Sequence, residues 1–277
     1  MRILTRISLI IILLVGWAGC NSEGLERDSA DTQTFLNLIE MISAENLGRT
    51  IKDLENFKTR YTWEKQEAVA NYLVQRLADY GLQLSIDEYD HNEKIWRNVV
   101  VCFPGKRMPE EIYMIIAHYD STSEQPEFAA PGADDNGTGT AAAIEIARML
   151  KETSLDSTVK IAFFSNEEQG RLGSKHFTKK ARSENQDIRG TINLDVIGYN
   201  NPIGSIEYGE GKKGSLLSQA KRQLKMVRNY AYSKLYPYGR VTVAGRPSNR
   251  GLVKKTSKAV KEFTRLGVVK DIDEDCG

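Results

Sequence analysis

Short apolar runs rich in β-branched and aromatic residues alternate with helical stretches through the middle of this chain. Runs of this kind, bounded by glycine or polar turns, indicate buried strands. They cover residues 83–89, 95–103, 111–117, 158–165 and 188–194, with helical patterns at 137–150 and about 171–182 and a further helical segment at roughly 32–81. Strands that alternate with helices need crossover connections, which place helices on both sides of a sheet. The pattern therefore predicts an α/β fold with a mixed, mostly parallel central sheet and helices on both faces.

A cluster of polar and acidic residues follows each of the strands predicted at 111–117, 158–165 and 188–194, and a fourth cluster directly precedes the helix at 137–150. The clusters are His118 with Asp120, Asp134 with Asp135, Glu167 with Glu168, and Asp195. In a parallel sheet, ligands gather beyond the carboxyl ends of the strands, so we expect these side chains to meet at one edge. One imidazole together with several carboxylates is a donor set that suits zinc.

Each cluster taken alone has a simpler interpretation. An aspartate or asparagine after a strand is often a helix N-cap or a turn residue. Asp135 and Asn136, which directly precede the helix at 137–150, could have only that function. The metal interpretation depends on all the clusters sharing one edge of the sheet.

The motifs in their order resemble those of the di-zinc exopeptidases. This family includes bacterial secreted leucyl aminopeptidases and, more distantly, glutamate carboxypeptidase and glutaminyl cyclase. The matching segments are residues 118–121 (HYDS), 131–137 (PGADDNG), 166–170 (NEEQG) and 193–195 (NLD), and the resemblance is clear from about residue 72 to residue 199. It implies a zinc-exopeptidase-like fold and the hydrolysis of peptide bonds at the N-terminus of peptide substrates.

The resemblance also implies a role for each matching residue. His118 and Asp195 would bind one zinc, Asp134 would bridge two zincs, and Glu168 would bind the second. The peptide bond after the bridging aspartate is typically cis in the family, which here would join Asp134 to Asp135. Glu167 would act as the general base on a metal-activated water. Asp120 would accept a hydrogen bond from the second ring nitrogen of His118 and so fix its tautomer.

One family feature is missing from this sequence. The second zinc of the family also has a histidine ligand after the equivalent of Asp195, whereas the only histidines here are His91, His118 and His176. We therefore expect a domain that is incomplete at its C-terminus, with one zinc or a weakened second site. Two alternatives remain open: an acyltransferase similar to glutaminyl cyclase, and a catalytically inactive binding homologue.

The amino-terminal residues resemble a bacterial lipoprotein signal. Arg2 and Arg6 precede a short apolar run, and the following Ala18, Gly19 and Cys20 resemble a processing site. We expect a signal peptide at residues 1–19, a lipid-bearing Cys20, a polar tether to residue 31 and the exopeptidase domain over residues 32–277. This organisation predicts a protein exported to the bacterial cell envelope and attached to a membrane by its lipid. The net charge of +1 argues against nucleic acid as a general partner.

Overall fold

A computed structural model describes residues 37–38, 40–198, 240–244 and 267–271 of the 277-residue chain. The chain divides into two units, one ending at Gly198 and the other beginning at Tyr199, and each is described by itself. The predicted signal peptide, the lipid-bearing Cys20 and the tether lie outside the described residues, so they stay predictions.

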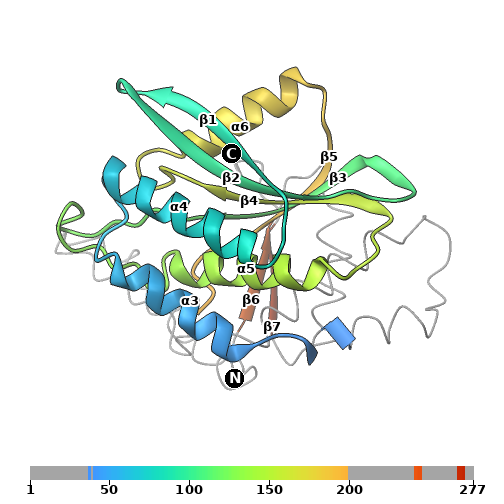
Figure 1. The fold of residues 1–277 in the computed structure, drawn as a ribbon, viewed down its shortest axis with the longest axis horizontal. Helices are drawn as coiled ribbons and strands as arrows, with labels where there is room; N and C mark the ends of the chain where they lie inside the picture. The colour runs from blue at the N-terminus through green and yellow to red at the C-terminus, as the bar shows by residue number, and fades with distance from the viewer. Residues whose placement is uncertain (1–36, 39, 199–239, 245–266, 272–277) are drawn as a thin grey trace, which may run out of the picture. The chain divides into compact units, whose positions relative to one another are not determined.

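A five-stranded mixed sheet forms the centre of the first unit (Figure 1). Its strands follow the spatial order β1-β2-β4-β3-β5. The β1-β2 and β2-β4 pairs are antiparallel, whereas β3 pairs in parallel with both β4 and β5. The bounds are β1 Leu84–His91, β2 Lys94–Phe103, β3 Met108–His118, β4 Ser157–Phe164 and β5 Asp187–Asn193. The predicted mixed α/β sheet is confirmed.

The register of β3 and β4 places their carboxyl ends side by side. Both strands are apolar along most of their length, and Ile115 pairs with Ile161 in the buried middle of the sheet. At the end of the ladder His118 pairs with Phe164. Burial on both faces explains why these runs are continuously hydrophobic rather than alternating. The residues that follow each strand therefore emerge at one edge.

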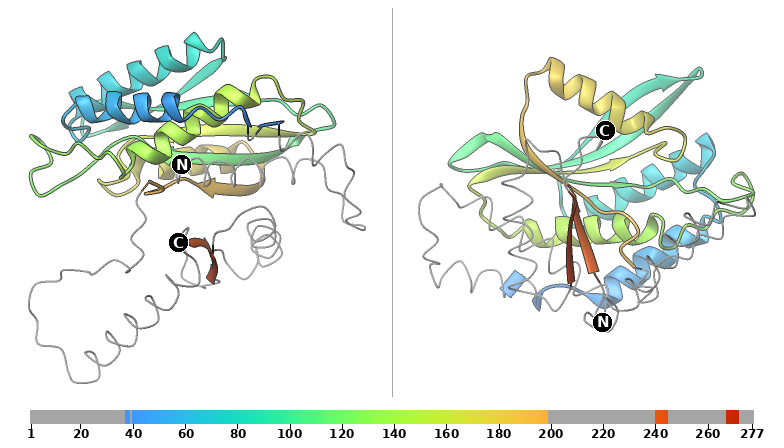
Figure 2. Two further views of the ribbon diagram at one scale, coloured as in Figure 1. Left: turned by 90° about the horizontal axis from the view of Figure 1, so that it is seen from below. Right: turned by 180° about the vertical axis from the view of Figure 1, so that it is seen from behind.

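Helices cover both faces of this sheet, as Figures 1 and 2 show. The helices α3, α4 and α5 lie on one face and form the larger hydrophobic core with it, while α6 lies on the other face and packs Phe177 and Ala181 against a smaller core. Their bounds are α3 Ala44–Asn56, α4 Trp63–Asp79, α5 Gly137–Leu150 and α6 Leu172–Ser183.

Val69, Leu73, Leu77 and Tyr80 recur at helical spacing in the sequence, which predicts an apolar stripe, and this stripe of α4 faces the core. Val69, Leu73 and Leu77 are fully buried, and Tyr80, just after the helix, packs partly buried against the same core. By contrast, almost every side chain of α5 is buried, because this helix lies against the sheet and is covered by α3 and α4. A helix that is apolar or small on all sides is expected in such a position.

The second unit contains a two-stranded parallel sheet, formed by β6 (Arg240–Ala244) and β7 (Gly267–Asp271). The sequence also predicts a basic helix at residues 248–263 and a short strand near Val268. Strand β7 confirms that strand, β6 was not predicted, and the helix lies outside the described residues. Across the part of the chain that is described, no helix has both the length and the apolar character that crossing a membrane requires.

Candidate metal centre

The ends of β3 and β5 bring two predicted ligands to the same edge of the sheet. His118 is the last residue of β3, and Asp195 follows β5 by two positions. The pairing continues past β5, because the Leu194 N–H donates to the Ile116 carbonyl over 2.8 Å. Asp195 is therefore held next to His118 by backbone hydrogen bonds.

Three side chains converge at this edge. The Nε2 atom of His118 lies 3.2 Å from an Asp135 oxygen and 3.5 Å from an Asp195 oxygen. All three possible ligand atoms lie within 4.8 Å of one another. The imidazole is buried, whereas the side chains of Asp135 and Asp195 are 53% and 39% exposed. One side of the group is thus open to solvent, as a catalytic metal site requires.

Asn136 fixes Asp135 in this position. It is the N-cap of α5, where its side-chain oxygen accepts from the Gly139 N–H over 3.0 Å, and its amide donates to the Leu194 carbonyl over 2.8 Å. Gly139 allows this approach, because a Cβ atom there would overlap the Leu194 carbonyl. Asp135 and Asn136 therefore differ in function: Asn136 is the helix cap, whereas Asp135 contacts the imidazole.

The structure brings Asp135, and not the predicted Asp134, into the group around His118. One carboxylate oxygen of Asp134 accepts from the Thr138 hydroxyl at 2.9 Å and from the Gly198 N–H at 2.8 Å, so it stabilises the start of α5 and the segment after β5. The predicted position of the cis peptide bond is wrong by the same single residue, since the cis bond joins Asp135 to Asn136. Two adjacent aspartates give no sequence signal for which of them faces the histidine.

Asp120 contacts the second ring nitrogen of His118. It is fully buried, and its Oδ1 lies 3.3 Å from His118 Nδ1. The same carboxylate accepts from the backbone N–H groups of Glu167 and Glu168, over 3.0 and 3.1 Å. Asp120 therefore connects the imidazole to the turn that follows β4.

Glu167 and Glu168 lie on that turn, close to the metal group but outside it. The close group of three ligand atoms includes neither side chain. A carboxylate oxygen of Glu167 lies 3.4 Å from Arg171 Nε. Burial and, second, the negative charge of Asp135 together raise the pKa of Glu168 to about 7. That effect places Glu168 within electrostatic reach of Asp135.

The pKa of His118 depends on its burial and on the negative charges around it. Burial lowers the pKa of the imidazole, but its hydrogen bonds with Asp120, Asp135 and Asp195 outweigh burial and raise the pKa to about 12. Hydrogen bonding to His118 in turn lowers the pKa of Asp135. The negative charges that stabilise the protonated imidazole of His118 would also stabilise a metal cation bound at the same place.

Arg60 is a site residue that sequence reasoning missed. Its guanidinium is completely buried and donates to the carbonyls of Tyr119, Pro131 and Gly132, which flank Asp120 and the turn before Asp135. Burial lowers the pKa of Arg60, the charges of Asp120 and Asp135 offset part of this effect, and the resulting pKa is about 10. No local pattern distinguishes this arginine from a solvated one.

The other histidines and the described cysteine lie elsewhere. His91 ends the edge strand β1, and His176 on α6 stacks on Tyr89 and lies 3.5 Å from Asp87. His91 therefore lies at an edge of the sheet and His176 on a helix, outside the group around His118. Cys102 is a free, exposed thiol on β2.

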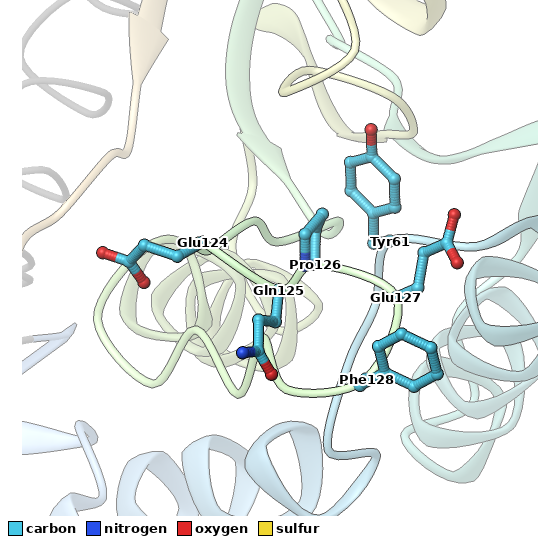
Figure 3. A pocket seen from close by; sticks show the side chains of 6 residues that line it. All are labelled: Tyr61, Glu124, Gln125, Pro126, Glu127 and Phe128. Carbon is cyan, nitrogen blue, oxygen red and sulfur yellow. The ribbon is translucent and has the colours of Figure 1, made fainter.

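A shallow hollow lies on the loop between β3 and α5 (Figure 3). None of the predicted site residues lines it, and the labelled side chains point in different directions rather than toward a common point. They are Tyr61, Glu124, Gln125, Pro126, Glu127 and Phe128. This hollow is therefore not the centre of the chemistry.

Comparison with known proteins finds relatives of this chain and solved structures that share its fold. A probable leucine aminopeptidase of Arthroderma otae is 32% identical over 202 residues, covering 68% of this chain and 53% of its own length. Among solved structures, LapB from Legionella pneumophila is 19% identical with a TM-score of 0.63, covering 95% of this chain and 63% of that one. A leucine aminopeptidase precursor from Bacteroides thetaiotaomicron is 18% identical with a TM-score of 0.56, covering 83% and 78%. At these identities the two structures show a shared fold.

The chain spans about half the length of the first relatives it matches. The model of peptidase family M28 matches residues 98–244, which is just over half of the chain and includes His118, Asp120, Asp135, Glu167 and Asp195. The protein is therefore a member of peptidase family M28.

Proposed function

We propose that this protein is a zinc-dependent aminopeptidase that hydrolyses the N-terminal peptide bond of peptide substrates. The observation that carries the proposal is the buried His118 imidazole, which faces Asp135 and Asp195 with one ring nitrogen and Asp120 with the other. Membership of family M28 and the leucine aminopeptidase named among its relatives support the choice of reaction.

The donor set fits zinc. One neutral imidazole nitrogen and two carboxylate oxygens are ligands that zinc accepts, and a carboxylate behind the imidazole is a common support for such a ligand. His118, Asp135 and Asp195 would hold the ion, and Glu168 would approach it from the turn after β4. A zinc ion bound there supplies Lewis acidity, lowering the pKa of a water molecule and polarising the scissile carbonyl.

The protein's own residues would move the proton. A carboxylate oxygen of Glu167 would accept the proton of the attacking water and later donate it to the leaving amine. Asp120 would hold His118 as the tautomer with Nδ1 protonated and Nε2 free. The same carboxylate would hold the backbone of Glu167 and Glu168, so that one buried group orients both the ligand and the base.

We propose one tightly bound zinc for this chain, because the described residues offer one group of possible ligands and His91 and His176 lie away from it. Among the described residues, a second ion would depend on Asp135 and Glu168 without an imidazole. We also propose export and lipid attachment at Cys20, as the amino-terminal pattern predicts. Cell fractionation tests this proposal: the lipid-anchored protein should be found in the membrane fraction, and a protein without the anchor in the soluble fraction.

Substitution of Glu167 tests the function. Glu167→Gln removes the base and keeps the shape, so hydrolysis of a leucine anilide should fall ~100- to 10,000-fold, the usual contribution of a general base. The zinc content, measured by elemental analysis, should stay unchanged. Glu184→Gln is the matched control, because Glu184 is exposed on the end of α6 and should leave the rate unaltered.

Two further measurements separate the parts of this proposal. Chelation should abolish hydrolysis, and added zinc should restore it. A substrate with an acetylated N-terminus should not be cleaved if the free amine is required. Full activity of Glu167→Gln would remove Glu167 from the role of base, and activity after complete zinc removal would overturn the metal-dependent reaction.

A further inference from the structure

The turn that carries Glu167 begins at Asn166, a buried residue in a left-handed conformation with φ of 53°. Asparagine is one of the few residues besides glycine that adopts this conformation readily. After it, the Glu167 carbonyl accepts from the N–H groups of Gly170 and Arg171. The direction of the Glu167 side chain is therefore set by how Asn166 is held.

Gln66 of α4 holds Asn166 at two points. Its Oε1 accepts from the Asn166 N–H over 3.1 Å, and its Nε2 donates to the Asn166 side-chain oxygen over 2.9 Å. The same Nε2 also donates to the Tyr61 carbonyl over 3.1 Å. Gln66 is 1% exposed, so these hydrogen bonds do not compete with bulk water.

The other half of the Asn166 side chain is also bonded, since its Nδ2 donates to the Tyr89 hydroxyl over 2.9 Å. Asp120 then binds the N–H groups of the next two residues, Glu167 and Glu168. Two buried acceptors therefore hold successive backbone N–H groups of this turn: the Gln66 amide oxygen holds that of Asn166, and the Asp120 carboxylate holds those of Glu167 and Glu168. Only Asp120 also touches the metal group, through His118.

We propose that Gln66 is a positioning residue for Glu167: it fixes the turn at Asn166 and so aims the general base. This inference rests on the proposed function, in which Glu167 accepts the proton. A displacement of about 1 Å of a catalytic group can lower a rate by roughly 100-fold. Losing the Gln66 contacts should therefore impair the chemical step and leave the ligands of the metal in place.

Gln66→Leu tests this, because leucine has a similar volume and removes both polar atoms. The expected result is a kcat lowered about 10- to 100-fold with KM and zinc affinity each within about threefold of the unsubstituted protein. Gln75→Leu is the matched control on the same helix. Gln75 is exposed and bonds to Asp79, so its replacement should change neither kcat nor zinc affinity.

A second variant approaches the same contact from the turn. Asn166→Gly tolerates the positive φ and removes the side chain that Gln66 binds, so its kcat should fall in the same range. The double variant should be no slower than the slower single variant, because both substitutions remove one shared interaction. If Gln66→Leu does not fold, as judged by circular dichroism, Asn166→Gly decides by the same criteria.

Three outcomes overturn the inference: a folded variant with kcat within twofold of normal, a loss of zinc affinity as large as the loss of kcat, or full additivity in the double variant. Glu167→Gln is measured in parallel. If that variant stays active, the proposed function has failed. If it is inactive while Gln66→Leu is fully active, only the role of Gln66 has failed.

Discussion

Asp120→Asn should damage both the stability of the fold and the affinity for zinc. The carboxylate is completely buried and receives three contacts, from His118 Nδ1 and from the N–H groups of Glu167 and Glu168. Asparagine has one acceptor oxygen. If that oxygen replaces Oδ1, the amide nitrogen replaces Oδ2 and faces the Glu168 N–H, so a buried donor loses its partner.

The magnitude follows from these contacts. An orphaned buried donor costs about 1–3 kcal/mol, and each of the two remaining hydrogen bonds weakens by about 1 kcal/mol when its acceptor loses its charge. The free energy of unfolding of the metal-free protein should therefore fall by about 3–5 kcal/mol. Zinc affinity should fall about 10- to 100-fold, because the imidazole loses its supporting carboxylate.

Urea unfolding of the metal-free protein and competitive zinc titration measure the two effects. Asp187→Asn is the control, since Asp187 is 45% exposed, forms a surface ion pair with Arg189 and should change stability by no more than about 0.5 kcal/mol. A loss of stability below about 1 kcal/mol together with unchanged zinc affinity would refute the reasoning, because Asp120 would then support neither the turn nor the imidazole.

Two further predictions concern pH and the turn before Asp135. The pKa values of His118 and Glu168 are raised to about 12 and about 7, so their protons compete with zinc and its affinity should fall as the pH falls. Titrations should show about a tenfold loss per pH unit above pH 7 and a steeper loss below it, where Glu168 also binds a proton; equal affinities at pH 6 and pH 8 would contradict this. Gly132→Ala should lower the free energy of unfolding by about 2–5 kcal/mol, because φ is +50° and the added Cβ would lie 2.6 Å from the Ser121 Cβ and 2.7 Å from Arg60 Nη2. The control Gly48→Ala lies in α3 with nothing within 4 Å and should stabilise the helix by about 1 kcal/mol, so equal thermal shifts for both variants would argue against the close packing at Gly132.

The sequence predicted the elements of the fold well because their signals are local. Burial makes β3 and β4 continuously apolar, and it places Val69, Leu73 and Leu77 at helical spacing on one face of α4. Both patterns can be recognised from residues that are neighbours along the chain. The position of Gln66 also carries a sequence signal. It lies three residues before Val69 on the same helical stripe and is a polar residue on an apolar face. That signal indicates a buried partner but does not name Asn166, which lies 100 residues away.

The choice between neighbouring residues needed the tertiary structure. Asp134 and Asp135 have the same side chain, and only the bonds of Asn136 to Gly139 and Leu194 turn the second of them toward His118. The contacts of Arg60 with three distant carbonyls are likewise invisible in its local sequence. The sequence alone determined the strands, the helices and the chemical character of the residues at their ends. Which oxygen atoms converge on the imidazole was decided by long-range hydrogen bonds, because these form only when segments far apart along the chain pack together.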